Sequence, residues 1–174
     1  TKVDMIITIK KRKIKKQMES WSMGNERSFI KFLSPARDKG TKMLKTGKVV
    51  KIYYPSAERI VRLSGHLLRQ SMMGSDFSYE DMTERSKKLR EEYGAEIKGE
   101  ESFQDTPCYL LVLTSKVPKQ TYFTRKVWID KERFIALKEE LYAKSGKLLK
   151  VTEIGKIKTI GKRYYPTEVI MMDK

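Results

Sequence analysis

The sequence predicts a mainly β protein whose strands pair in antiparallel fashion. Apolar and basic residues alternate along most of the chain, which is the pattern of strands that turn one side to solvent. Turn-forming residues interrupt this alternation about every ten residues. The regular succession of strand, helix and strand that builds a parallel sheet is missing from the sequence. The pattern therefore favours a sandwich, a barrel or a strongly curved sheet.

Short segments with this alternation supply the predicted strands. Segment 134–143 fits a helix as well as a strand, because its apolar residues match both periods. We interpret it as a strand, since it leads into a meander with turns at Ser145-Gly146 and Gly161-Lys162. The predicted strands are 3–14, 15–23, 28–33, 41–44, 49–54, 57–63, 95–98, 108–115, 121–130, 134–143, 148–157 and 164–172.

Two stretches in the middle of the chain have helical character. Residues 76–82 form a predicted short helix, with Ser75 and Asp76 in position to cap its first turn. Residues 83–93 present a polar face, and Gly94 is expected to end that helix. A loop is expected over residues 99–107.

Charge and cysteine content limit the classes of protein. A total of 38 Lys and Arg against 22 Asp and Glu gives a net charge of +16, which implies a partner of negative potential. Nucleic acid, an anionic membrane surface and an acidic protein all fit this charge. The single cysteine, Cys108, excludes an internal disulfide and lies in an apolar run, so we expect it to be buried. The longest apolar runs, of about six residues, are far shorter than the ~20 residues of a membrane-spanning helix.

Most signatures of catalysis are missing from the sequence. It contains no P-loop, dinucleotide-binding or nucleophile-elbow motif. His66, the single histidine, has no acid close to it in the sequence. Asp76, Glu80 and Asp81 are a possible cation site or carboxylate pair, but at the start of a short helix carboxylates usually cap the chain and favour the dipole. We therefore expect no catalytic residue, no metal-binding residue and no cofactor.

Three blocks of the sequence closely resemble one known family. They are residues 32–41, residues 52–56 and residues 73–82, the last of which reads Met-Gly-Ser-Asp-Phe-Ser-Tyr-Glu-Asp-Met. Residues 127–130, 145–147 and 165–167 follow the same pattern near the end of the chain. The similarity is to the outer-membrane lipoprotein-sorting family, the LolA-like group that includes spirochaete-type members. It extends over nearly the whole chain, and the 73–82 block is its most specific part.

This resemblance implies a fold and a function. The implied fold is a strongly curved antiparallel sheet that forms an unclosed β-barrel, with a few short helices over the open face, as in LolA and LolB. Residues 1–174 are then expected to be a single lipid-binding domain. The implied protein is periplasmic, its signal peptide removed or trimmed, and holds acyl chains between sheet and helices for sorting to the outer membrane. No catalytic residues come with the resemblance.

Methionine and aromatic side chains are the natural lining for such a cavity. Methionine is flexible and fits ligands that have no fixed shape, and the chain has nine of them. The expected partners are lipid or lipoprotein acyl chains, with an anionic membrane surface or an acidic envelope protein in addition, and no nucleic acid. The candidate cavity residues are Trp21, Phe29, Leu33, Ile52, Tyr54, Met72, Met73, Phe77, Leu111 and Trp128.

Two other functions remain open at the level of sequence. A lipid hydrolase on the same scaffold would need Ser64, Ser75 or Ser78 as nucleophile, with His66 or Asp76 as its partner. A protein that binds nucleic acid or an anionic surface is suggested by the net charge alone. The carrier is the expected function, and the protein is not expected to be an enzyme.

Overall fold

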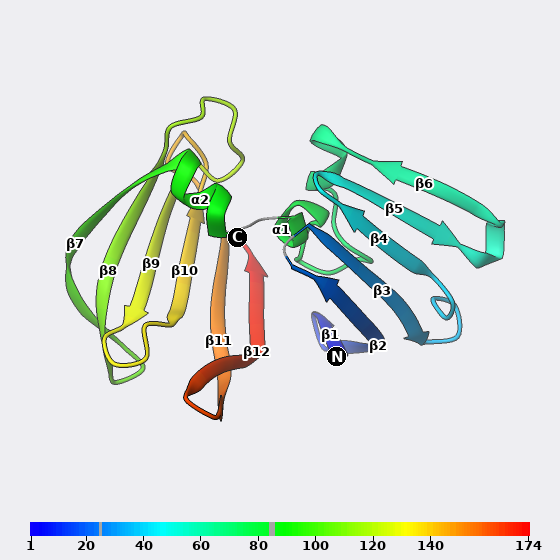
Figure 1. Ribbon diagram of the computed structural model, residues 1–174, viewed down its shortest axis with the longest axis horizontal. Coiled ribbons are helices and arrows are strands. Elements are labelled where there is room, and N and C mark those ends of the chain that lie inside the picture. Colours follow the sequence, from blue (N-terminus) through cyan, green and yellow to red (C-terminus); the bar gives the residue numbers. More distant parts are fainter. Residues whose placement is uncertain (25, 84–85) are drawn as a thin grey trace. The chain divides into compact units, whose positions relative to one another are not determined.

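The computed structural model describes residues 1–24, 26–83 and 86–174 (Figure 1). The chain forms two compact units, Thr1–Arg85 and Ser86–Lys174, and each is described here by itself. Over the described residues the twelve strands form two six-stranded antiparallel sheets. Within each sheet every strand pairs with its neighbour in sequence, and neither sheet closes on itself. The predicted class, mainly β, antiparallel and unclosed with short helices, is confirmed.

The first unit contains one sheet and three short helical segments. The sheet runs in the order β1 to β6. Its strands are β1 (Lys2–Ile9), β2 (Arg12–Met23), β3 (Arg27–Ser34), β4 (Lys42–Thr46), β5 (Val49–Tyr54) and β6 (Arg59–Leu63). The helical segments are η1 (Pro55–Ala57), η2 (Gly65–Arg69) and α1 (Tyr79–Thr83).

The second unit begins with a helix and continues as a meander. Its elements are α2 (Ser86–Glu92), β7 (Tyr93–Phe103), β8 (Thr106–Ser115), β9 (Thr124–Asp130), β10 (Ala136–Tyr142), β11 (Leu148–Ile160) and β12 (Arg163–Asp173). Segment 134–143 is therefore a strand as predicted, and β10 pairs with both β9 and β11. The hairpin of β11 and β12 turns at Gly161-Lys162 as predicted.

The first predicted strand, 3–14, is in fact divided by a turn. Strand β1 ends at Ile9, Ile9 pairs with Arg12, and Lys10 has a φ of +54°. Neither Lys10 nor Lys11 is a residue type that marks a hairpin turn, so the alternation seemed to continue through them. The strand boundary predicted between residues 14 and 15 is wrong, and β2 runs through it.

The loop predicted over residues 99–107 is also wrong. Strand β7 continues to Phe103, and a two-residue turn of Gln104 and Asp105, with φ of +48° and +61°, leads into β8. Gly99 lies at a register shift of the β7–β8 ladder, where a glycine signals a bulge in a strand. Gly94 lies within β7 and does not end the preceding helix.

The core of the second unit includes the single cysteine. Cys108 is fully buried, as predicted, and packs with Trp128 and Leu137. Burial raises the pKa of the Cys108 thiol. The indole Nε1 of Trp128 donates a hydrogen bond of 2.7 Å to the carboxylate of Glu101. This part of the sheet is therefore closely packed, with the polar edge of its tryptophan satisfied.

A buried aspartate fixes the turn between β9 and β10. Burial alone would raise the pKa of Asp130. Backbone N–H groups of Arg133 and Glu132 donate to its carboxylate at 3.1 and 2.9 Å, and the Arg133 side chain pairs with it. Together these interactions hold the pKa of Asp130 below its ordinary value.

Candidate apolar binding site

One face of the first sheet gathers the apolar core of the first unit. Cross-strand partners lie on the same face of a sheet, and Ile30 of β3, Met43 of β4, Ile52 of β5 and Val61 of β6 form one such row. The first three of these are buried and Val61 is partly buried. The same face also carries buried Met18, Phe32, Val50 and Leu63.

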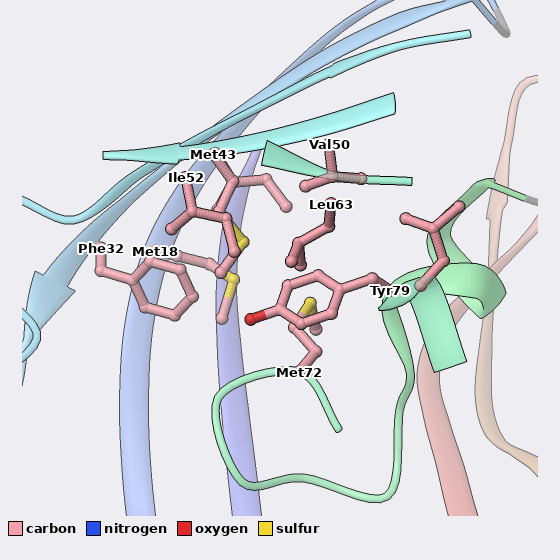
Figure 2. Close-up of a cluster of buried hydrophobic side chains, with 10 residues drawn as sticks. Met18, Phe32, Met43, Val50, Ile52, Leu63, Met72 and Tyr79 are labelled. Atoms are coloured by element: carbon pink, nitrogen blue, oxygen red, sulfur yellow. The ribbon is translucent and has the colours of Figure 1, made fainter. Parts of the chain in front are cut away.

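Segment 65–82 covers this face. Its buried apolar side chains are Leu68, Met72 and Tyr79. Figure 2 shows Met72 and Tyr79 pointing from the cover toward the sheet residues. We call the whole group the methionine-rich cluster, because it includes six of the nine methionines: Met5, Met18, Met43, Met72, Met73 and Met82.

The cover is held largely by hydrogen bonds within itself. The Met72 N–H donates to the Phe77 carbonyl at 2.7 Å, and the Tyr79 N–H donates to the Gln70 carbonyl at 3.2 Å. The Ser75 hydroxyl donates to the Met72 carbonyl at 2.7 Å. The chain reverses at Met73 and Gly74, which have φ of +55° and +80°. The segment is thus a small folded loop held mainly by local hydrogen bonds. It rests on the sheet largely through apolar side chains, and the side chain of Tyr79 also hydrogen-bonds to that of Tyr54 in β5.

The helix α1 that ends this cover is capped by Ser78, which the sequence analysis did not expect as a cap. The Ser78 hydroxyl accepts the Asp81 N–H at 3.2 Å, while the Asp81 carboxylate accepts the Ser78 N–H at 2.7 Å. This is a reciprocal capping box. The cap predicted at Ser75 and Asp76 is therefore wrong, since the helix begins at Tyr79. Capping, the structural role predicted for the acidic cluster, is performed by Asp81. The carboxylate Oε2 of Glu80 lies 3.9 Å from Nε of Arg69.

We expect Ser78→Ala to lower the free energy of unfolding by about 1 kcal/mol, because it removes the acceptor for the Asp81 N–H. Ser78→Thr retains the hydroxyl and should lose much less. Urea denaturation followed by circular dichroism measures both variants. Equal stability of Ser78→Ala and wild type would show that the cap contributes nothing to the cover.

Polar groups interrupt this apolar face at defined points. Lys16 lies two residues from Met18 on β2, is 1% exposed and pairs with Asp38. Lys45 lies two residues from Met43 on β4, and burial lowers the pKa of its ammonium group. Burial also raises the pKa of Tyr79, and the nearby Tyr54 adds to this effect. The face is therefore apolar at its centre and carries ammonium groups beside it.

The structure brings together five of the candidate cavity residues. Ile52, Tyr54, Met72, Met73 and Phe77 all belong to the methionine-rich cluster or pack against it. They come from β5 and from the cover, which are separated in sequence by η1 and β6.

Five other candidates lie elsewhere. Trp21 and Phe29 are cross-strand partners with ring centroids 5.6 Å apart, on the opposite face of the first sheet from the cluster. Leu33 follows buried Phe32 in β3 and therefore also points to that opposite face. Leu111 and Trp128 belong to the second unit, on opposite faces of its sheet, since Trp128 pairs with Leu110.

The candidate cavity residues did not include several residues at the centre of the cluster. They are Met18, Phe32, Met43, Val50, Leu63 and Tyr79. In β5 the sequence does carry a signal for Val50, because Lys51 stands between Val50 and Ile52 as a polar residue between two apolar ones; β4 reads Lys-Met-Leu-Lys-Thr and gives no such signal for Met43.

Of the other groups that carried a chemical hypothesis, the hydroxyls of Ser75 and Ser78 make hydrogen bonds within the cover. His66 is exposed in η2. Among residues 1–24, 26–83 and 86–174, no group of three or more His, Cys, Asp and Glu side chains is arranged to hold a metal ion. In the same residues, no helix has the length and apolar character needed to span a bilayer.

Comparisons with known proteins agree with this architecture. A family model described as "Uncharacterized protein" matches residues 24–174. The comparison with curated proteins found no match. A DUF1329 family protein from Desulfovibrio piger has a TM-score of 0.85 at 24% identity, over 98% of this chain and 76% of that one.

Two further solved structures are similar over almost the whole chain. An outer membrane lipoprotein-sorting protein domain, so named, from Vibrio parahaemolyticus has a TM-score of 0.84 at 23% identity, covering 98% of this chain and 75% of its own. A LolA superfamily protein from Nitrosomonas europaea has a TM-score of 0.77 at 26% identity, covering 99% and 76%. The matched family model and these neighbours together agree with the resemblance seen in the sequence blocks, and the chain belongs to a LolA-like family.

Proposed function

We propose that this protein is a periplasmic carrier that binds the acyl chains of lipids or lipoproteins, with the methionine-rich cluster as its acyl-chain site. In this proposal residues 1–174 act as one lipid-binding domain, without a cofactor and without catalysis. The names of two neighbours, a lipoprotein-sorting domain and a LolA superfamily protein, support this class of ligand.

The single observation that carries the proposal is the composition and covering of the cluster. Six methionines and Phe77 meet between a regular sheet and a short loop whose hydrogen bonds are mainly internal. Methionine side chains repack with little cost, so they can surround an acyl chain of variable length. Each buried methylene of the ligand contributes about 0.8 kcal/mol. Displacement of the loop would exchange its apolar contacts for contacts with the ligand while keeping its own hydrogen bonds.

The test is a photoactivatable fatty acid, cross-linked to the purified protein and mapped by mass spectrometry. We expect saturable labelling of the cover and of the facing strands β4 and β5. Native mass spectrometry of the protein as purified should show bound lipid. Lack of saturable binding, or labelling confined to the second unit, would overturn the proposed site.

A pair of variants separates the cluster from nonspecific apolar contact. Phe77 is partly buried in the cover, whereas Phe134 is 74% exposed in the second unit. Phe77→Ser should weaken binding of the fatty acid about tenfold, since a large apolar contact is lost. Phe134→Ser should leave the affinity unchanged. Circular dichroism of both variants checks that the fold is retained.

A further inference from the structure

The face of the first sheet opposite the methionine-rich cluster has an unusual composition. The solvent-facing side of an antiparallel sheet is ordinarily polar. Here Trp21 is 50% exposed, Met23 71%, Leu44 43% and Ile60 67%. We call this side the outer face, and it is formed by strands β2 to β6.

The strand register orders the outer face into rows. Trp21, Phe29, Leu44, Lys51 and Arg62 are successive cross-strand partners, so they form one row across five strands. The Trp21 and Phe29 rings pack against each other at its start. Exposed apolar groups thus give way to exposed cations along a single line.

The next row repeats this mixture. Glu19, Lys31, Lys42, Tyr53 and Ile60 are successive partners across the same strands. The Lys42 ammonium lies 5.6 Å from the centre of the Tyr53 ring. On the other side of the first row, Met23 pairs with Arg27, which pairs with Thr46.

Together the three rows contain five basic side chains and one carboxylate, Glu19. Basic groups among exposed tryptophan and aliphatic side chains and a partly exposed tyrosine match the interface of an anionic bilayer, where aromatic rings lie at headgroup level and cations bind the phosphates. The rows are neighbours on one face of the sheet, so several of their groups can contact one surface at the same time. The opposite face of the sheet is used by the cluster, so both functions fit on the same strands.

We propose that the outer face of the first sheet is a docking surface for anionic phospholipid membranes. Trp21 and Ile60 enter the interface, and Arg27, Lys31, Lys42, Lys51 and Arg62 bind the lipid phosphates. The surface does not depend on whether the cluster binds acyl chains, and its test uses no fatty acid, so the two proposals fail separately.

The chain carries its own probe for this test. It has two tryptophans, and Trp128 is buried in the second unit whereas Trp21 lies on the outer face. Vesicles that contain phosphatidylglycerol should shift the emission of Trp21 to shorter wavelength, and brominated lipids should quench it. Phosphatidylcholine vesicles should have little effect. Trp21→Phe should abolish the response while Trp128 still emits.

Matched charge variants distinguish this surface from attraction to the net charge. Lys51→Gln with Arg62→Gln should weaken binding to the anionic vesicles about 30-fold, since each cation near such a surface contributes about a factor of five. Lys119→Gln with Lys147→Gln removes the same charge from exposed positions of the second unit and should change binding less than about threefold.

Three results would overturn the proposal. The first is an equal loss in the two pairs of variants. The second is vesicle binding without a response from Trp21. The third is a Trp21 response to polyglutamate or duplex DNA but none to vesicles, which would assign the surface to an acidic protein or to nucleic acid.

Discussion

Asp38→Ala is expected to lower the free energy of unfolding by about 3–5 kcal/mol, because it leaves the ammonium group of Lys16 buried without its carboxylate. Lys16 is fully buried and Asp38 is nearly so. The Lys16 Nζ donates a hydrogen bond to Asp38 Oδ2. Exposed Arg37 is farther from the same carboxylate, at 3.7 Å, and cannot replace Lys16 in the interior.

The position of this pair explains why its loss should affect the whole first unit. Lys16 lies on β2, beside Met18 of the methionine-rich cluster. Asp38 lies in the turn between β3 and β4, where its N–H donates to the Pro35 carbonyl at 2.9 Å and its carbonyl accepts the Thr41 N–H at 3.0 Å. The pair therefore joins β2 to the hydrogen-bonded turn that follows its neighbouring strand, β3.

A second variant separates the cost of an unpaired charge from the value of the pair. Replacement of both members by apolar residues, Lys16→Met with Asp38→Leu, should recover most of the lost stability, since neither charge remains to be buried. The surface pair of Asp4 and Lys15, at 2.8 Å, is the matched control, and Asp4→Asn should change stability very little. Urea denaturation followed by circular dichroism measures all three. A double variant as unstable as Asp38→Ala would contradict this explanation.

The buried lysines illustrate what alternation in a sequence can and cannot predict. The two-residue period places Met18, Met43 and Ile52 on one face of the first sheet, and they are buried there. The same period places Lys16 and Lys45 on that face, although lysine at an alternating position is ordinarily solvated. The partner of Lys16 is 22 residues away in a loop, so nothing local in the sequence predicts the pair.

The missed turns have a related cause. Turn prediction depends on glycine, proline, asparagine and aspartate, which tolerate unusual backbone angles. The turn at Lys10 and Lys11 contains none of these residues and is set by the pairing of the strands that flank it, Ile9 with Arg12. Gly99 looked like part of a loop, yet it lies at a bulge inside a continuous strand. Strand pairing depends on residues far apart in the chain, so it cannot be predicted from a short stretch of sequence.

The candidate site was predictable only in part, because strand register also decides which side chains lie on its face. The 73–82 block, which carried the family resemblance, lies in the cover, and Met72, Met73 and Phe77 contact the cluster. Trp21 and Phe29 were expected in the cavity because large aromatic side chains are usually buried, but the register turns them to the outer face. Composition predicts which residues are apolar, whereas register decides the face on which each one lies.

The second unit has an interior charge of its own, and Arg125→Ala is expected to lower the free energy of unfolding by about 3–5 kcal/mol. Arg125 lies on β9 and is 1% exposed. Its Nη1 lies 3.1 Å from the Glu139 carboxylate on β10. Its guanidinium carbon lies 5.0 Å from the centre of the Tyr93 ring and 5.5 Å from that of Tyr122. Truncation would leave a cavity beside both rings and a carboxylate without this partner.

The flat shape of the Arg125 guanidinium, as well as its charge, stabilises its packing against the two tyrosine rings. A conservative variant can show this. The guanidinium is flat and stacks on aromatic faces, whereas an ammonium group is a compact and strongly hydrated charge. Arg125→Lys should therefore restore only part of the stability lost in Arg125→Ala. The hydroxyl of Tyr93 donates to the Tyr122 carbonyl and keeps one ring in place, so the rings themselves should persist in both variants.

The neighbouring Lys126 provides the control for position. It lies on the same strand with its side chain on the other face, only partly buried, and its ammonium is 5.5 Å from the Tyr142 ring. Lys126→Ala should cost no more than about 1 kcal/mol, as expected for a partly exposed cation on an aromatic ring. Urea denaturation followed by the emission of Trp128, in a Trp21→Phe background, reports on the second unit alone. Full rescue by Arg125→Lys would mean that charge alone is required at this position and would contradict the role of the two tyrosine rings.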